Sequence, residues 1–391
     1  MPKAIVAGVG MVKFAKPGQQ PSFRVTAAES IRLAMADAGV TPEDVQQAYA
    51  SFIFLGSGSG QHAVYDVFQT GIPIINLNNA CAAGSTGLFL ARQLIEAGAL
   101  DCVLVVGFDE MQRGAIPTQF PFELVGKRVE AVLDRDGFAA GGDLSRWFGA
   151  AGRLYMQRYG VGREIFAKVA VKARRHAAAN PYALFTAPIS EEDVLNSPVI
   201  YDEYMTRLMA CPPTCGSAAA VLVSDAFAKR RGISRGVEIL GQSLATDTEA
   251  SWQDAIGACG ADNARRAAQS VYEQTGIGPE DVDVIELHDC FTTNEVISYE
   301  ALGLCPEGGA TALVEAGDNT YGGRYVINPS GGLMSKGHPI GATGVAQCCE
   351  LTWQLRGDAG ARQVPNARLA LQHNIGLVAA ATVTMYRLAQ N

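Results

Sequence analysis

One sequence pattern occurs twice in this chain. The first copy begins with a cysteine and the second begins with a histidine. The two copies lie 257 residues apart and read Cys81-x-x-Gly84-x-Thr86-Gly87 and His338-x-x-Gly341-x-Thr343-Gly344. A second pattern, Gly-x-x-Pro-Glu-Asp-Val, starts at Gly39 and again at Gly276, an offset of 237 residues. The chain therefore has the pattern of a fused, diverged duplicate. If the halves fold alike about a pseudo-twofold axis, equivalent loops meet there and set a cysteine opposite a histidine, a pair suited to nucleophilic catalysis.

Cys81 follows the apolar run 74–77 and precedes a stretch of small residues that is typical of a helix start. At a helix N-terminus, free N–H groups and the dipole favour a thiolate. With a cationic neighbour they lower a cysteine pKa from about 8.5 to roughly 3.5 to 7.5. We therefore predict an activated nucleophile at this position. A buried cysteine packed among alanines is the competing interpretation.

His338 lies within a glycine-rich segment, 328–344, and Pro339 suits the first turn of a following helix. From there its imidazole could accept the Cys81 proton and later donate a hydrogen bond to an oxyanion. A phosphate-binding loop is a second interpretation, but the Lys-Ser or Lys-Thr ending of such a loop is absent from the sequence. A histidine that only caps the helix is the third.

Three further residues extend the candidate centre. His288 and Cys290 follow the strand-like run 284–287 and so lie at its carboxyl end, where sites of α/β proteins gather. His373 lies within Gln-His-Asn-Ile-Gly, 372–376. Each of these histidines, taken alone, could be a buried core residue whose hydrogen bonds are all made. Because His288, His338 and His373 are three of only five histidines in the chain, together they favour a catalytic centre.

Composition excludes several classes of protein. Hydrophobic residues make up 48% of 391 residues, enough for a large α/β core, and the net charge of -8 without a long basic tract argues against nucleic-acid or anionic-membrane binding. Two short basic runs, 172–176 and 229–231, suit solvated helix faces better than phosphate sites. Nine cysteines without a disulfide framework or paired zinc-ligand spacing predict a reducing compartment, the cytoplasm, and no metal. No apolar stretch reaches the roughly 18 residues of a membrane span.

Short apolar runs alternate with helical periods in both halves. The runs 4–9, 74–77, 102–106, 218–223, 237–240, 284–287 and 369–372 predict strands, and 26–38, 85–97, 264–275 and 344–355 predict helices. This βαβ alternation predicts an α/β protein with a mixed sheet in each half. Residues 113–210 have no counterpart in the second half and predict an inserted, substrate-covering domain. The first half then comprises 1–112 and 211–235, and the second half comprises 236–391.

These residues resemble the thiolase superfamily, and within it the thiolase domain of the sterol carrier protein x type. The resemblance runs over most of the chain outside its middle third. It is carried by the segments 71–76, 284–291, 300–308, 318–323, 337–344 and 372–376. It implies the five-layered αβαβα thiolase fold, built from two duplicated halves with an inserted loop domain, and a dimer or tetramer.

The resemblance also implies a role for each candidate residue. Cys81 would accept the acyl group, His338 would activate it, and Cys290 would be the acid/base at the enolate carbon. His288 and His338 would donate N–H groups to the thioester oxygen. The backbone N–H groups of Cys81 and Gly376 would hold the acyl oxyanion, with His373 and Asn374 in support.

The implied reaction is the reversible cleavage of a 3-oxoacyl-CoA by coenzyme A. It gives a shortened acyl-CoA plus acetyl-CoA or propionyl-CoA, as in fatty acid β-oxidation, with coenzyme A as co-substrate and no permanently bound cofactor. Two alternatives remain: a steroid side-chain retro-aldolase that pairs with a small OB-fold partner, and a non-catalytic acyl-CoA or lipid-binding protein on the same scaffold.

Two departures from the family pattern bear on the acyl site. Val378 and Ala379 stand where relatives often carry Gly-Gly, which adds side chains there and predicts a narrower pocket. Residues 112–149, in the region where the family shapes its acyl tunnel, also diverge. The Ala-Gln-Asn ending is not a peroxisomal address.

Overall fold

The computed structural model describes residues 2–114, 126–141, 143–378 and 380–389. In its first half the strands are β1 (Ala4–Met11), β2 (Gln47–Ser51), β3 (Ile74–Leu77), β4 (Cys102–Asp109) and β7 (Gly216–Ser224). The helices of this half are α1 (Phe23–Ala38), α2 (Ser59–Tyr65), α3 (Ala83–Glu96) and α8 (Asp225–Arg231).

The second half repeats this plan. Its strands are β8 (Val237–Ala245), β9 (Val284–Glu286), β10 (Val326–Ile327), β11 (Leu369–Gly376) and β12 (Ala380–Leu388). Its helices are α9 (Asp262–Thr275), α10 (Thr292–Ala301), α11 (Ala310–Glu315), α12 (Gly332–Ser335) and α13 (Thr343–Arg356). Every strand and helix predicted from the sequence is confirmed within a few residues. The prediction missed β2, β10 and β12; β2 and β12 mix polar with apolar residues, and β10 has only two residues.

The order of the strands confirms the duplication. Ten strands form one sheet in the order β10-β9-β11-β12-β8-β1-β7-β4-β2-β3. Counted outward from its centre, β1-β7-β4-β2-β3 corresponds strand for strand to β8-β12-β11-β9-β10. In each half, the second strand in sequence is parallel to both of its neighbours, and the last strand is antiparallel to its neighbours.

A separate sheet in each half was predicted, and on this point the structure differs. Two residue pairs, Ile5 with Glu238 and Val6 with Val237, join β1 to β8 and make the sheet continuous. The first strands of the two halves thus meet at the middle of the sheet, where their backbone groups pair with each other and not with water.

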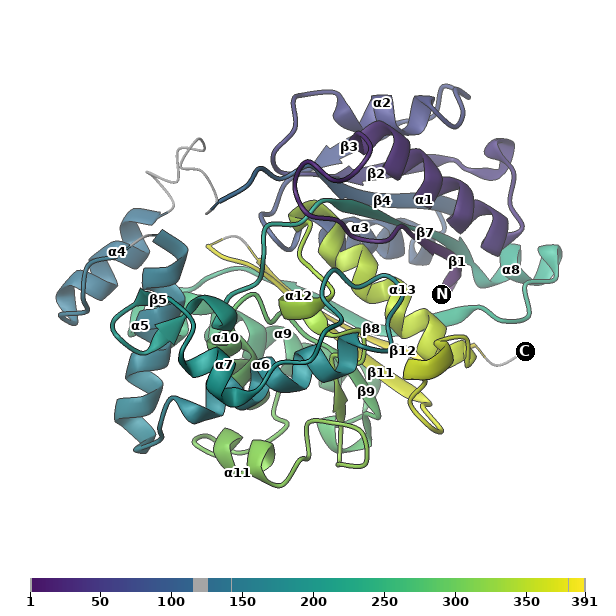
Figure 1. Ribbon diagram of the computed structural model, residues 1–391. Coiled ribbons are helices and arrows are strands. Elements are labelled where there is room, and N and C mark those ends of the chain that lie inside the picture. Colours follow the sequence, from purple (N-terminus) through teal and green to yellow (C-terminus); the bar gives the residue numbers. More distant parts are fainter. Residues whose placement is uncertain (1, 115–125, 142, 379, 390–391) are drawn as a thin grey trace.

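The two halves of the sheet lie on either side of a central layer made by α3 and α13, as Figure 1 shows. α1 covers the outer face of the first half and α9 that of the second, which completes the five layers of the predicted fold. Glycines allow the central helices to approach closely. A Cβ on Gly84 would lie 3.0 Å from the Gly341 carbonyl oxygen, and one on Gly344 would lie 2.4 Å from the Ser85 backbone nitrogen.

Between β4 and β7 the described residues form four α-helices and a small hairpin, drawn in blue and teal at the left of Figure 1. These elements are α4 (Gly126–Arg135), α5 (Asp143–Tyr159), α6 (Glu164–Ala177), α7 (Glu191–Leu195), β5 (Val199–Tyr201) and β6 (Met205–Thr206). A buried ion pair between Lys172 of α6 and Glu295 of α10 ties them to the second half. His176 of α6 also hydrogen-bonds the Asn328 carbonyl at 3.0 Å, where the glycine-rich segment begins.

In the part of the chain that the structure describes, every helix is too short or too polar to cross a membrane.

Candidate active site

Cys81 lies in a tight turn between β3 and α3, two residues before the helix begins. Ala80 has a φ of 48°, a left-handed conformation that costs a non-glycine residue about 1 kcal/mol or more. The Asn78 side chain accepts the Ala80 backbone N–H at 3.1 Å and holds this turn. The strained turn places Cys81 at the N-terminus of α3, as the sequence predicted.

The structure brings Cys81, His288 and His338 together. The Cys81 Sγ atom and one ring nitrogen of each histidine all lie within 4.8 Å of one another. The two imidazoles meet edge to face, with centroids 5.1 Å apart and planes inclined by 82°. Both histidines are buried, whereas Cys81 is partly exposed. The site therefore has one partly exposed cysteine backed by two buried imidazoles.

A chain of hydrogen bonds fixes the tautomer of His288. The Gly344 carbonyl can only accept, so the Gln372 group 2.7 Å from it is the Nε2 amide, which also donates to Ser85 Oγ. Ser85 is assigned as the donor to Asn374 Oδ1, at 2.8 Å, and Asn374 Nδ2 donates to His288 Nδ1, at 2.9 Å. Because Nδ1 accepts, the proton of neutral His288 is on Nε2.

His338 has the opposite arrangement. Its Nδ1 atom lies 2.6 Å from Thr343 Oγ1, and the Thr343 hydroxyl donates to the Pro339 carbonyl at 3.0 Å. A hydroxyl has one proton, so we assign Nδ1–H as the donor to Thr343. Nε2 of His338 is buried without a hydrogen-bond partner among the described residues and carries a lone pair. One imidazole thus presents a donor to the site and the other presents a base.

The protonation of Cys81 differs from the prediction. Burial, and then the nearby Asp109 carboxylate, raise the pKa of the Cys81 thiol to about 12, against the expected lowering. Burial and Lys336 lower the pKa of His338 to about 3. Desolvation outweighs the helix dipole here, so the resting pair is a neutral thiol beside a neutral imidazole.

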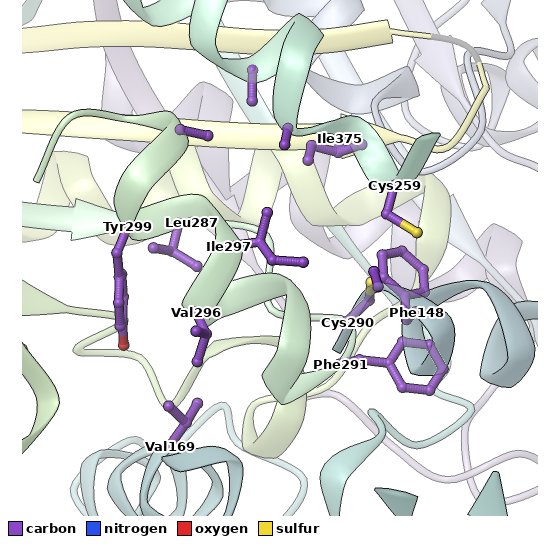
Figure 2. Close-up of a cluster of buried hydrophobic side chains, with 14 of the residues drawn as sticks. Phe148, Val169, Cys259, Leu287, Cys290, Phe291, Val296, Ile297, Tyr299 and Ile375 are labelled. Atoms are coloured by element: carbon purple, nitrogen blue, oxygen red, sulfur yellow. The ribbon is translucent and has the colours of Figure 1, made fainter. Parts of the chain in front are cut away.

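Cys290 lies on the apolar side of the site. Figure 2 shows it beside Cys259 and the stacked rings of Phe148 and Phe291, whose centroids are 4.9 Å apart. Its exposed fraction is 6%, and burial, with Cys211 and Cys81 nearby, raises the pKa of its thiol well above the usual value. Cys290 is therefore a neutral thiol within electrostatic range of the Cys81 sulfur.

The supporting residues of β11 divide between two faces. Gln372 and Asn374 point toward the central helices, so His373 between them points away. Both ring nitrogens of His373 are buried with no hydrogen-bond partner among the described residues, and the His373 ring lies close enough to His288 to help lower the pKa of that imidazole. Gly376 reaches the Cys81 turn, since a Cβ there would lie 2.0 Å from the Asn79 carbonyl oxygen. After it, Val378 adopts a φ of 53°, which is unfavourable for a β-branched residue, and Ala379 lies outside the described residues.

Four positioning residues were not assigned roles from the sequence. Ser85 and Thr343 lie inside the duplicated pattern, and their hydroxyls orient the two histidines. Asp109 accepts backbone N–H groups from Ile53 and Gly341, and Asp289 accepts that of Leu333 at 2.7 Å. These carboxylates hold the His338 segment to the rest of the site. For the two carboxylates the available signal was a polar residue at or near the end of a strand, since Asp109 ends β4 and Asp289 follows β9 by three residues.

One thiol and two imidazoles are also ligands that suit zinc. A metal requires a lone pair on the ring nitrogen that it binds, whereas the hydrogen-bond chain through Ser85 and Asn374 leaves a proton on Nε2 of His288. Binding at His288 would reverse that chain, so the donor set favours oxyanion stabilisation over metal ligation.

Comparisons with known proteins extend this description. Residues 5–225 match the thiolase N-terminal domain model, and residues 245–386 match the thiolase C-terminal domain-like model. Sterol carrier protein 2 of Oryctolagus cuniculus is 48% identical over 396 residues, covering 99% of this chain and 72% of that protein. The benzoylsuccinyl-CoA thiolase subunit BbsB of Thauera aromatica is 34% identical, covering 96% of this chain and 94% of its own. The solved Ltp2–ChsH2(DUF35) aldolase superposes with a TM-score of 0.84 at 25% identity, covering 99% and 98% of the two chains.

Proposed function

This chain belongs to the thiolase family, and we propose that it cleaves 3-oxoacyl-CoA with coenzyme A through an acyl-enzyme on Cys81. The observation that carries the proposal is the pair of opposite tautomers assigned to His288 and His338 beside the Cys81 thiol. A base and an oxyanion donor, both preorganised next to a nucleophile, are the groups that acyl transfer needs.

The first half-reaction forms the acyl-enzyme. Nε2 of His338 accepts the Cys81 proton as the sulfur attacks the 3-keto carbon, and the backbone N–H groups of Cys81 and Gly376 stabilise the oxyanion. The bond between C2 and C3 then breaks. The leaving enolate, derived from acetyl-CoA or propionyl-CoA, takes hydrogen bonds from Nε2–H of His288 and from the now protonated His338. Cys290 donates a proton to its carbon.

The second half-reaction releases the product. The thiol of coenzyme A gives its proton to the Cys290 thiolate and attacks the acyl carbon, and Cys81 leaves as a thiolate that takes back the proton held by His338. Each preorganised oxyanion donor is typically worth about 3 kcal/mol of the barrier. Coenzyme A acts as co-substrate, and we propose that residues 113–210 help to cover it.

Replacement of Thr343 tests the tautomer of His338. In Thr343→Val the buried Nδ1–H loses its acceptor, an unsatisfied group that costs about 1–3 kcal/mol. The proton then favours Nε2, so the base is lost and we expect the rate constant of acylation to fall by roughly 10- to 100-fold. KM should change little. Thr343→Ser keeps the hydroxyl and should retain activity within a few-fold; equal losses in both variants, measured by stopped-flow acylation, would contradict the assignment.

A retro-aldolase is the second candidate, because a solved aldolase of this family has a TM-score of 0.84. Aldol cleavage needs no acyl-accepting thiol, whereas this chain places Cys81, Cys290 and both histidines around one centre. The aldolase proposal also requires a second protein, since the solved relative is a complex with a DUF35 chain. Mass spectrometry of protein quenched during turnover distinguishes the two: an acyl adduct on Cys81 supports thiolase chemistry.

The substrate is tested by CoA-dependent cleavage of three 3-oxoacyl-CoA esters: straight-chain, 2-methyl-branched and steroid-type. We expect at least one to be cleaved to two CoA esters, with acetyl-CoA from a straight chain and propionyl-CoA from a 2-methyl chain. Binding of all three without cleavage of any would support a lipid carrier in place of the enzyme.

The free state of all nine cysteines supports a reducing compartment such as the cytoplasm.

We also propose that the protein is a dimer formed through β3. This strand is the outer strand of the first half of the sheet, so one of its edges is unpaired. Its Ile75 side chain is 42% exposed, which is unusual for a large apolar residue beside a functional loop. Ile75→Lys should convert a dimer into a monomer in sedimentation velocity, and Val25→Lys, at an even more exposed apolar site on α1, should not. A monomeric wild type would reject the proposal.

A further inference from the structure

A short segment, Ala210 to Thr214, connects the two loops that carry catalytic residues. Ala210 forms an antiparallel bridge with Phe291, and Pro213 forms a parallel bridge with His338. Between these bridges the Cys211 backbone N–H donates to the Cys290 carbonyl at 2.9 Å. A third thiol therefore lies between the His288–Cys290 loop and the His338 loop, and the proposed reaction gives it no role.

The bridge sets Cys211 directly opposite Cys290. Because Ala210 and Phe291 are paired and antiparallel, the next residue on one side faces the preceding residue on the other. Both paired residues are extended, with φ and ψ of −119° and 144° for Ala210 and −132° and 150° for Phe291. In an antiparallel pair, opposite side chains project to the same face with Cα atoms roughly 4.5–5.5 Å apart. Disulfides span Cα separations of about 4.4–6.8 Å.

The two thiols differ in access. Cys211 is partly exposed, whereas Cys290 is buried behind it. Burial, and then the adjacent Cys81, raise the pKa of Cys211 above its usual value. Of these two thiols Cys211 is the more open to a small oxidant, and its reaction should be faster at alkaline pH because the thiolate is the reactive form.

We propose that Cys211 and Cys290 form a reversible disulfide when the protein meets a peroxide. The Cys211 sulfur attacks one peroxide oxygen, the O–O bond breaks, and Cys211 becomes a sulfenic acid with release of one water. The Cys290 sulfur then attacks the Cys211 sulfur, and a second water leaves as the S–S bond forms. In total two thiols lose two electrons and two protons, and one hydrogen peroxide becomes two waters.

The disulfide would separate the two reactions of the centre, a consequence that rests on the proposed function. It removes the acid/base thiol, so carbon–carbon bond cleavage stops. Cys81 remains free, so acyl exchange between CoA esters continues. Oxidation would thus convert a cleaving enzyme into an acyl exchanger, until a dithiol reduces it.

The test treats wild-type protein with hydrogen peroxide at pH 8.5, removes the excess with catalase, and maps linked peptides without reduction. The expected result is one linked pair containing Cys211 and Cys290, iodoacetamide labelling retained at Cys81, and thiolysis reduced at least 100-fold but restored by dithiothreitol. In Cys211→Ser the linked peptide should not form. The loss of thiolysis activity that dithiothreitol reverses should also disappear. Cys305→Ser is the matched control, since Cys305 is also partly exposed and the proposed reaction gives it no role, and it should behave like wild type.

A disulfide between Cys81 and either Cys211 or Cys290 would overturn the proposal. So would a loss of thiolysis in Cys211→Ser that is as large as in wild type and is likewise restored by dithiothreitol. Cys290→Ser gives a second route, because it must also abolish the link. Peptide mapping does not depend on activity. If the link forms but the reduced protein cleaves no 3-oxoacyl-CoA, the proposed function fails and the disulfide stands.

Discussion

Cys81→Ser should lose 3-oxoacyl-CoA cleavage and acyl exchange together, by on the order of 10⁴-fold or more. A serine hydroxyl is a far weaker nucleophile than a thiolate, and the neutral His338 beside it is a weak base for an alcohol. The burial that raises the pKa of the thiol to about 12 would penalise an alkoxide more strongly. Both reactions pass through the same acyl-sulfur bond, so neither should survive. The measurement is steady-state thiolysis with parallel exchange of label between CoA esters.

The fold should not suffer from this change, because serine and cysteine differ little in volume and Cys81 is partly exposed. Cys305→Ser serves as the control for general loss of a thiol. Its activity and melting temperature should match those of wild type. Thiolysis by Cys81→Ser at more than a few per cent of the wild-type rate would remove this residue from the mechanism, as would an acyl adduct on another residue.

Cys290→Ala should separate the two reactions. General acid/base catalysis is usually worth about 10² to 10⁴ in rate, so thiolysis should fall at least a hundredfold. Acyl exchange onto Cys81 needs only the nucleophile, His338 and the oxyanion donors, and it should change by only a few-fold. The two rates are measured on one preparation of each variant.

Packing is the alternative reason for a loss, because Cys290 fills space beside Phe148 and Phe291. Cys290→Ser keeps the side-chain volume and removes the thiol, so it should show the same separation of rates as Cys290→Ala. Cys259→Ala is a matched cavity control in the same cluster and should affect both reactions alike. Parallel losses of exchange and thiolysis in Cys290→Ser would reject the acid/base role.

Much of this site could be predicted from local sequence. Cys81 and His338 could be predicted because they are the first residues of the two copies of the duplicated pattern. Each copy is typical of one local structure, a tight turn followed by small residues and the start of a helix. The glycines of the pattern have a definite physical cause, since Gly84 and Gly344 leave room for α3 and α13 to cross. His288 and Cys290 were found because polar residues directly after a buried strand lie at the sheet edge where ligands bind.

Other features arise only from contacts between distant segments. Ser85 and Asn374 are 289 residues apart in sequence, yet their 2.8 Å hydrogen bond sets the tautomer of His288. The sequence placed His373 in support of the site, and the alternation of β11 turned it to the other face. The same limit applies to Cys211, whose neighbour Cys290 is identified only by the bridge between Ala210 and Phe291.

The sequence by itself predicted which residues would carry the proposed chemistry and that two similar halves bring them together, because turns, helix starts and strand ends are local properties. Tertiary structure alone decided their protonation. A helix N-terminus lowers a thiol pKa in isolation, but the body that assembles around Cys81 removes water from it and raises that pKa to about 12. Desolvation depends on every segment that covers the sulfur, and those segments come from both halves of the chain.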